Sequence, residues 1–228
     1  MNDRYSNVRA ARYGARPTTV IDATAHRVLR NTYMLLALTL GFSALTAGLS
    51  AALALPHPGM LITMIGYFGL LFAITKFRNS GVGVALVFAL TGFMGYTLGP
   101  IIGYYLAMPN GTQIVSMAMG GTAAIFLGLS AYVLVSKRDM TFMGGFLTVG
   151  ILVAFLAGLA AIFFDMPALS LAVSAMFVLL MSGLILFETS NIIRGGETNY
   201  VMATVTLYVS IYNLFVSLLQ LLGLANND

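Results

Sequence analysis

The sequence predicts an all-α membrane protein built from seven transmembrane helices. Three observations lead to this prediction. Of the 228 residues, 59% are apolar and only 8% are charged, whereas soluble domains carry roughly 25% charged residues. Seven apolar segments follow one another along the chain, most of them about as long as a bilayer requires. The basic residues lie only in the amino-terminal tail and in alternate connections between these segments.

The seven segments are apolar runs separated by short polar turns. Their expected ranges are 32–55, 60–75, 82–108, 113–135, 142–164, 167–187 or beyond, and 200–222. The third segment contains Gly99 and Pro100. Proline removes the hydrogen bond that its amide would donate to the carbonyl of Tyr96, so we expect a kink or break there. Gly99 and Pro100 are therefore either an architectural bend or a hinge for gating.

The Lys and Arg residues predict the orientation in the membrane. If the amino terminus is cytoplasmic, all eleven basic residues fall on the cytoplasmic side, in the tail and in the connections at 76–78, 137–138 and 194. The opposite connections, around His57, Asn110 and Asp165, contain none. Seven spans then place residues 224–228 as a short periplasmic tail, with the bundle at 27–223.

Residues 1–26 are expected to form a flexible, basic cytoplasmic tail because they are polar and poor in large apolar side chains. A tail of this length has a root-mean-square reach of about 25–30 Å. One interpretation is an anchor that contacts anionic membrane lipids. The other is a handle that a partner protein grips, in which the engaging residues would be Arg4, Arg9, Arg12 and Arg16.

The last apolar segment carries a polar stripe. Its members recur at intervals of 4, 3, 4 and 3 residues, which places them on one side of a helix: they are Thr206, Ser210, Asn213, Ser217 and Gln220. A polar stripe cannot face lipid without a large cost, so we expect the other six helices to enclose the last one. The alternative role of the stripe is hydrogen bonding between helices and nothing more.

Glu188 is the acid expected within a span, near the cytoplasmic end of the sixth helix. An ionisable residue there is a candidate for an ion site or a pH sensor. Its candidate partners are Arg194 after the same helix and Thr206, Ser210 and Asn213 on the last one. Protonation of Glu188 would then change how the two helices pack. The alternative is an interfacial carboxylate that pairs with Arg194 or water and has no further role.

Several chemistries are not expected. The absence of cysteine excludes disulfides and thiolate metal sites, and the two histidines lie outside the spans. Ser130 has no histidine base within any span, and no nucleotide-binding loop is present. We therefore expect that the protein is not an enzyme and has no catalytic residue. We expect no metal site and no cofactor, apart from possible weak Ca²⁺ binding. Neither a nucleic-acid partner nor a small-molecule substrate is indicated by the sequence. Asp165, just before Met166 and Pro167, is expected to cap the sixth helix.

Four stretches carry a family resemblance: GFMGYTLGPII at 92–102, AMGGTAAIF at 118–126, LFETSNII at 186–193 and LYVSIYNLFVSLLQLLG at 207–223. Together they resemble the Bax inhibitor family, the transmembrane Bax inhibitor motif proteins. The likeness covers nearly all of residues 27–223. It implies seven transmembrane helices with the last one enclosed by the other six.

The resemblance implies a first function, a pH-sensitive calcium leak. In such relatives the sensor is a pair of acids on the last two helices that is latched to an arginine. Glu188 matches the position of the first acid, whereas Ser210 occupies the position of the second. No Lys or Arg lies inside the second helix. The paired-acid switch is therefore incomplete here, and a leak would depend on Glu188 as its titrating group.

A closer resemblance points to a second function. RNTYMLLALTLGFSALTA at 30–47, LFETSNIIRGGETNY at 186–200 and the basic tail resemble a bacterial subgroup of the family that modulates FtsH. FtsH is a hexameric ATP-dependent zinc protease of the inner membrane. The resemblance implies an inner-membrane protein that FtsH engages through its amino-terminal tail and degrades slowly, so that it restrains proteolysis of other substrates. A structural bundle without chemistry is the remaining alternative.

Overall fold

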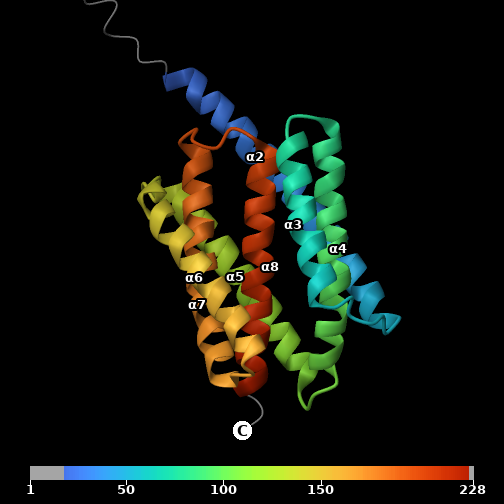
Figure 1. Cartoon of the computed structure of the whole chain (residues 1–228). Helices are drawn as coiled ribbons and strands as arrows, with labels where there is room; N and C mark the ends of the chain where they lie inside the picture. The colour runs from blue at the N-terminus through green and yellow to red at the C-terminus, as the bar shows by residue number, and fades with distance from the viewer. Residues whose placement is uncertain (1–17, 226–228) are drawn as a thin grey trace, which may run out of the picture.

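The computed structural model describes residues 18–225, which form seven long helices in one bundle (Figure 1). The helices are α2 (Thr18–Ala52), α3 (Met60–Phe77), α4 (Gly81–Leu106), α5 (Gly111–Ser136), α6 (Gly144–Phe163), α7 (Pro167–Ile193) and α8 (Tyr200–Ala225), with a 3-10 turn, η1 (Thr141–Met143), before α6. All seven are long and apolar enough to cross a membrane. The described residues contain no strand. The predicted all-α class and the seven predicted spans are confirmed.

The first helix begins earlier than the sequence suggested. We expected a flexible tail as far as residue 26, but α2 already begins at Thr18. Extending an existing helix adds one hydrogen bond per residue without a new nucleation cost, so a long apolar span can propagate helix into a polar flank. The residues Arg4, Arg9, Arg12 and Arg16 lie outside the described part of the chain, and their role stays a prediction.

Pro100 does not break α4, which continues through it from Gly81 to Leu106. The proline leaves the carbonyl of Tyr96 without its usual amide donor. The hydroxyl of Ser50 on α2 donates to this carbonyl over 2.9 Å. A side chain from a neighbouring helix therefore replaces the lost bond, which explains why the helix can pass through this position.

Small residues let α2 and α4 approach closely around the same place. A Cβ added to Gly95 would lie 2.0 Å from Oγ1 of Thr46, and one added to Gly99 would lie 2.4 Å from Oγ of Ser50. Neither position has room for a side chain. These two glycines therefore fix the contact between α2 and α4, as small residues commonly do in membrane bundles.

The last helix, α8, lies inside the bundle. It packs against α2, α4, α5 and α7, and Figure 1 shows it between α7 and the α3–α4 pair. No residue from Tyr200 to Gly223 is exposed. In the polar stripe, Ser210 and Ser217 are buried, and Thr206, Asn213 and Gln220 are half-buried. The stripe thus avoids the outer surface, while enclosure by all six other helices stays a prediction.

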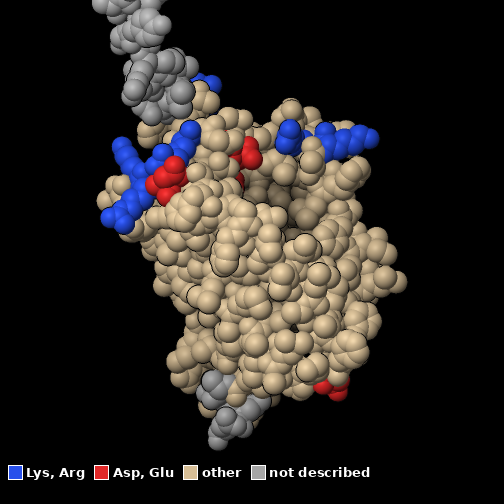
Figure 2. All heavy atoms as spheres, turned by 60° about the vertical axis from the view of Figure 1, so that its left-hand side comes forward, with Lys and Arg blue, Asp and Glu red and all other residues tan. Residues whose placement is uncertain are grey.

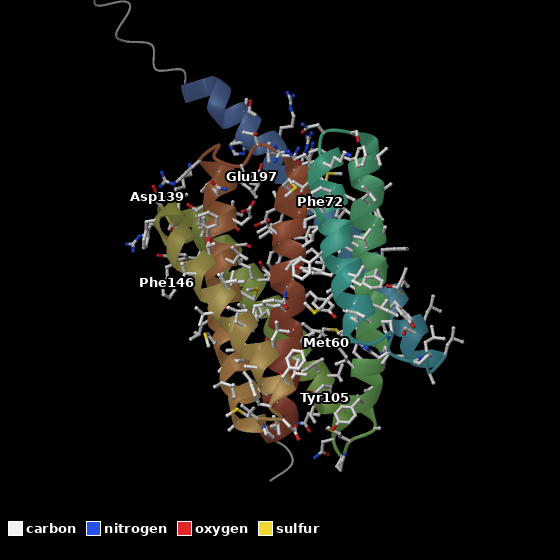
Figure 3. The ribbon with its side chains drawn as sticks, in the orientation of Figure 1. Met60, Phe72, Tyr105, Asp139, Phe146 and Glu197 are labelled. Carbon is white, nitrogen blue, oxygen red and sulfur yellow. The ribbon has the colours of Figure 1, made fainter. Side chains whose placement is uncertain are left out.

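The outer surface is apolar, and the charges gather at one end. Phe72 on α3 and Phe146 on α6 point outward and are 74% and 71% exposed (Figure 3). Figure 2 shows Lys and Arg atoms at the end where α2 begins, with an acid at the opposite end. This distribution is the one that a membrane-spanning bundle with a basic cytoplasmic side would have.

The expected cap at the start of α7 is wrong. Asp165 has a positive φ of 48°, and the residue that precedes α7 is Met166, which makes no side-chain cap. The amide of Met166 donates to the carbonyl of Ala161 over 2.9 Å. Asp165 therefore helps to end α6. It does so in a left-handed backbone conformation, which aspartate tolerates better than most residues.

The bond between Ser50 and Tyr96 predicts a stability effect. Replacing Ser50 with Ala leaves the carbonyl of Tyr96 unsatisfied between two helices, so the free energy of unfolding should fall by about 1–2 kcal/mol. Thr75→Ala is the control, because its hydroxyl bonds only the Leu71 carbonyl of its own helix. Unfolding in mixed detergent micelles measures both. Equal stability losses in the two variants would contradict this role of Ser50.

Candidate functional site

Glu188 is buried within α7, five residues before the helix ends at Ile193. Its side chain is 4% exposed. Its Oε1 atom is buried and accepts no hydrogen bond from any described residue. A buried, unpaired carboxylate oxygen is costly in a folded protein. Glu188 is therefore the strongest candidate for a site where a proton, water or cation is held.

Two more buried hydroxyls without hydrogen-bond partners lie at the same level of the bundle, those of Thr32 on α2 and Ser130 on α5. The level is set by Tyr33, whose hydroxyl lies 3.4 Å from Oγ1 of Thr189. The ring of Tyr33 also stacks on that of Phe126, with centroids 6.0 Å apart.

These contacts place the three polar groups at a similar depth in the bundle. Thr32 adjoins Tyr33, Glu188 adjoins Thr189, and Ser130 follows Phe126 by one helical turn. Three helices therefore bring unsatisfied polar atoms to one layer near the basic end. The fourth helix, α8, joins them through the hydroxyl of Thr204, which lies 3.3 Å from the carbonyl of Thr32.

The predicted partners on α8 do not hydrogen-bond Glu188. The hydroxyl of Ser210 donates to the carbonyl of Thr206 over 2.8 Å, and Nδ2 of Asn213 donates to the carbonyl of Val209 over 2.9 Å. Both side chains bond the backbone of their own helix, which satisfies them locally. Ser210 is buried and Asn213 half-buried, and neither side chain supplies a ligand to Glu188 in this conformation.

The predicted pairing of Glu188 with Arg194 is wrong. Nε of Arg194 lies 3.5 Å from Oδ1 of Asp139, and its Nη2 donates to the carbonyl of Lys137 over 3.0 Å. Arg194 follows Glu188 by six residues, which at about 100° per residue puts it on a different side of the helix. It therefore ties the end of α7 to the α5–α6 connection.

Asp139 lies in that connection, at the same end of the bundle as Glu197 in the α7–α8 turn (Figure 3). The hydroxyl and the amide of Thr141 both donate to Oδ1 of Asp139, over 2.6 and 2.9 Å. These bonds, with a smaller contribution from Arg194, hold the pKa of Asp139 below its usual value. Asp139 is therefore the charged partner of Arg194 that the sequence analysis did not identify.

The far end of the polar stripe serves helix packing. Gln220 accepts a hydrogen bond from the hydroxyl of Ser174 over 2.6 Å, and its Nε2 donates to Oγ of Ser170. Both serines lie on α7. At this end, the interpretation of the stripe as interhelical hydrogen bonding fits the observed contacts.

Two tyrosines on α8 were missed by the sequence analysis. The hydroxyl of Tyr208 lies 2.7 Å from Oγ of Ser43 and 3.3 Å from the carbonyl of Thr91. The hydroxyl of Tyr212 lies 3.3 Å from Oγ1 of Thr97. They link α8 to α2 and α4. The available signal was a tyrosine in the middle of an apolar span, because its hydroxyl must find a partner there.

The remaining predicted features have no direct test in the structure. Gly99 and Pro100 occupy a continuous helix, and their role as a hinge stays a prediction. Among the side chains of residues 23–224, no three from His, Cys, Asp or Glu gather where they could hold a metal ion. A cation at Glu188 would therefore depend on one carboxylate together with hydroxyl, carbonyl or water oxygens.

The bundle and its buried acid define a multi-pass α-helical membrane protein with one carboxylate enclosed in its penultimate helix. The chain belongs to the Bax inhibitor family, because residues 25–227 match the family described as "Inhibitor of apoptosis-promoting Bax1". This match confirms the resemblance noted in the sequence.

Comparison with individual proteins shows which members of the family this chain is similar to. The chain is 55% identical over 205 residues to "Modulator of FtsH protease YccA" of Escherichia coli K12, which covers 90% of this chain and 93% of the relative. Identity and coverage are the same for "Inner membrane protein YccA" of Escherichia coli O6:H1. An "Uncharacterized membrane protein" of Vibrio cholerae is 44% identical over 204 residues, 89% of this chain and 92% of that one. With its seven spans, the chain is a multi-pass protein of the bacterial inner membrane.

The unpaired state of Glu188 predicts that the acid costs stability. Replacing it with Met, a side chain of similar length, removes the unsatisfied oxygen and should raise the free energy of unfolding by about 1–3 kcal/mol. Glu197→Met is the matched control, because Oε1 of Glu197 accepts the Asn199 amide over 2.6 Å and its loss should not stabilise. A destabilised Glu188→Met variant would show that the carboxylate is satisfied in solution.

Proposed function

We propose that this protein modulates an FtsH-type membrane protease as a slowly degraded competitor that the protease engages through the amino-terminal tail. The 55% identity over 90% of the chain to a modulator of FtsH protease is the observation that carries the proposal. The proposed orientation has a cytoplasmic amino terminus and a periplasmic carboxyl terminus. The gathering of Lys and Arg at one end supports it (Figure 2).

The packing of the bundle supports slow degradation. To extract a helix, the protease must break contacts that hold polar groups away from lipid, and each group left unsatisfied costs several kcal/mol. Tyr208 links α8 to α2 and α4, and Ser50 links α2 to α4 across Pro100. Pulling on α2 from its amino terminus would therefore strain the helices at the centre of the bundle early.

The second candidate is a pH-sensitive cation leak in which Glu188 is the titrating group. The burial of Glu188 and the unpaired state of its Oε1 favour this function. The unpaired hydroxyls of Thr32 and Ser130 would supply further oxygens to a cation or water in the same layer. Ser210, Asn213 and Thr206 would take part only after α8 moved relative to α7.

The proposed engagement of the amino-terminal tail by the protease predicts the first functional outcome. Deleting residues 2–17, which ends before α2 begins at Thr18, should abolish the protection of a second FtsH substrate and slow the turnover of the protein itself. The measurement is the half-life of both proteins in cells that contain FtsH. Deleting residues 226–228 at the other terminus is the control. Unchanged protection by a tail-deleted protein that still folds would contradict the proposal.

The cation-leak candidate predicts a second functional outcome, which depends on Glu188. If the protein leaks cations, calcium flux into proteoliposomes should depend on pH for the wild type, and Glu188→Gln should remove that dependence because it cannot change charge. Glu197→Gln, in the turn outside the spans, is the control. Flux no greater than in empty liposomes, from mildly acidic to mildly alkaline pH, would exclude the leak and leave the protease proposal intact.

A further inference from the structure

A groove opens on the outer surface of the bundle between α2, α4, α5 and α8, and its volume is about 570 Å³. Tyr208 and Phe215 of the buried helix α8 lie among its lining residues. Its exposed rim includes Gly48 on α2 and Met119 and Leu127 on α5. These rim residues lie within the spans, so the groove opens toward the membrane.

The groove calls for an apolar occupant. The polar side chains in its lining already have partners: Ser43 lies 2.7 Å from the hydroxyl of Tyr208, and Thr122 donates to the carbonyl of Ala118 over 2.7 Å. No group there needs a water molecule. In a bilayer, the surrounding medium that can fill such a space is the acyl chain of a lipid.

The volume favours a single acyl chain over a partner helix. A methylene group takes about as much space as a water molecule, about 30 Å³, so a groove of about 570 Å³ has room for the lower part of one extended acyl chain. A helix about 10 Å in diameter fills about 420 Å³ per turn. The groove would therefore hold little more than one turn of a transmembrane helix.

A basic pocket lies on the same two helices nearer the charged end. Its lining includes His26, Arg27 and Arg30 on α2 and Leu134 on α5. Both arginines are exposed. Among the side chains of residues 23–224, the one ion pair joins Arg194 to Asp139, so no carboxylate in that range neutralises Arg27 or Arg30.

The basic pocket and the groove follow one another along the α2–α5 side of the bundle, and we call this stretch the α2–α5 seam. Tyr33 lines the pocket and stacks on Phe126, which lines the groove. Arg30 and Ala44 are separated by fourteen residues, or about 21 Å along α2. This distance is close to the length of an extended acyl chain below its headgroup. The seam therefore presents positive charge at the membrane surface and the apolar groove beneath it.

We infer that the α2–α5 seam binds one anionic phospholipid, with its phosphate at Arg27 and Arg30 and an acyl chain in the groove. The cations supply the preference for a negative headgroup, and the groove supplies a fixed place for the chain. Neither part depends on the protease or on Glu188.

Native mass spectrometry of the delipidated full-length protein tests the charge. Phosphatidylglycerol should bind more tightly than phosphatidylethanolamine. The Arg27→Gln/Arg30→Gln variant should weaken phosphatidylglycerol binding about 25-fold, about fivefold for each cation, with phosphatidylethanolamine unchanged. The control Lys76→Gln/Arg78→Gln removes the same charge from the carboxyl end of α3 and the turn that follows it, at the same end of the bundle. Equal binding of the two lipids, or an equal loss in the control, would overturn the inference.

A matched pair on α5 tests the groove. Ala123 and Ala124 are adjacent and both exposed, but Ala123 lines the groove and Ala124 does not. Ala123→Phe should lower phosphatidylglycerol binding at least several-fold, whereas Ala124→Phe should not. Size-exclusion chromatography checks that each variant is folded. Gly48→Leu is a second, independent variant that fills the groove, and position 48 has room for a side chain because an added Cβ would meet no atom within 4 Å. Unchanged phosphatidylglycerol binding in both groove variants would overturn the lipid assignment. A wild-type dimer that becomes monomeric in these variants would also overturn it, because the groove would then hold a second copy of the protein.

Discussion

The bilayer offers no hydrogen-bond partners, so each polar group inside the bundle must be satisfied by another part of the protein. This constraint explains the position of α8, from which no residue between Tyr200 and Gly223 is exposed. It also explains why Ser50 lies opposite the carbonyl that Pro100 leaves free. The contacts that answer the constraint are the ones that join helices distant in sequence, above all Tyr208 with Ser43 on α2 and Thr91 on α4.

Glu188 is the exception that gives the molecule a candidate site. It lies in a layer with the unpaired hydroxyls of Thr32 and Ser130, so three helices meet there with unmet hydrogen-bonding capacity. Proteins tend to keep such costly groups where function requires them. The arrangement is compatible with a leak, while modulation of a protease needs only the tail and a bundle that resists extraction. The two functions therefore depend on different parts of the chain and can be separated experimentally.

Much of the architecture could be predicted because it follows from transfer of side chains between water and lipid. The apolar segment expected at 60–75 became α3 at Met60–Phe77, and the one expected at 200–222 became α8 at Tyr200–Ala225. Local boundaries were less predictable: α2 extends back to Thr18 because helix propagates from an apolar span into a polar flank. Asp165 matched the pattern of an N-cap but instead helps to end the preceding helix.

The order of residues along the chain was enough to predict the seven spans, the basic end and the absence of the polar stripe from the outer surface, since each depends on composition and helical spacing alone. The partners of individual side chains required the folded bundle. Arg194 pairs with Asp139 rather than Glu188, Ser210 bonds its own helix, and the seam between α2 and α5 joins residues about a hundred positions apart. Which groups meet depends on how helices rotate and pack against one another, and that packing involves contacts that no local pattern in the sequence encodes.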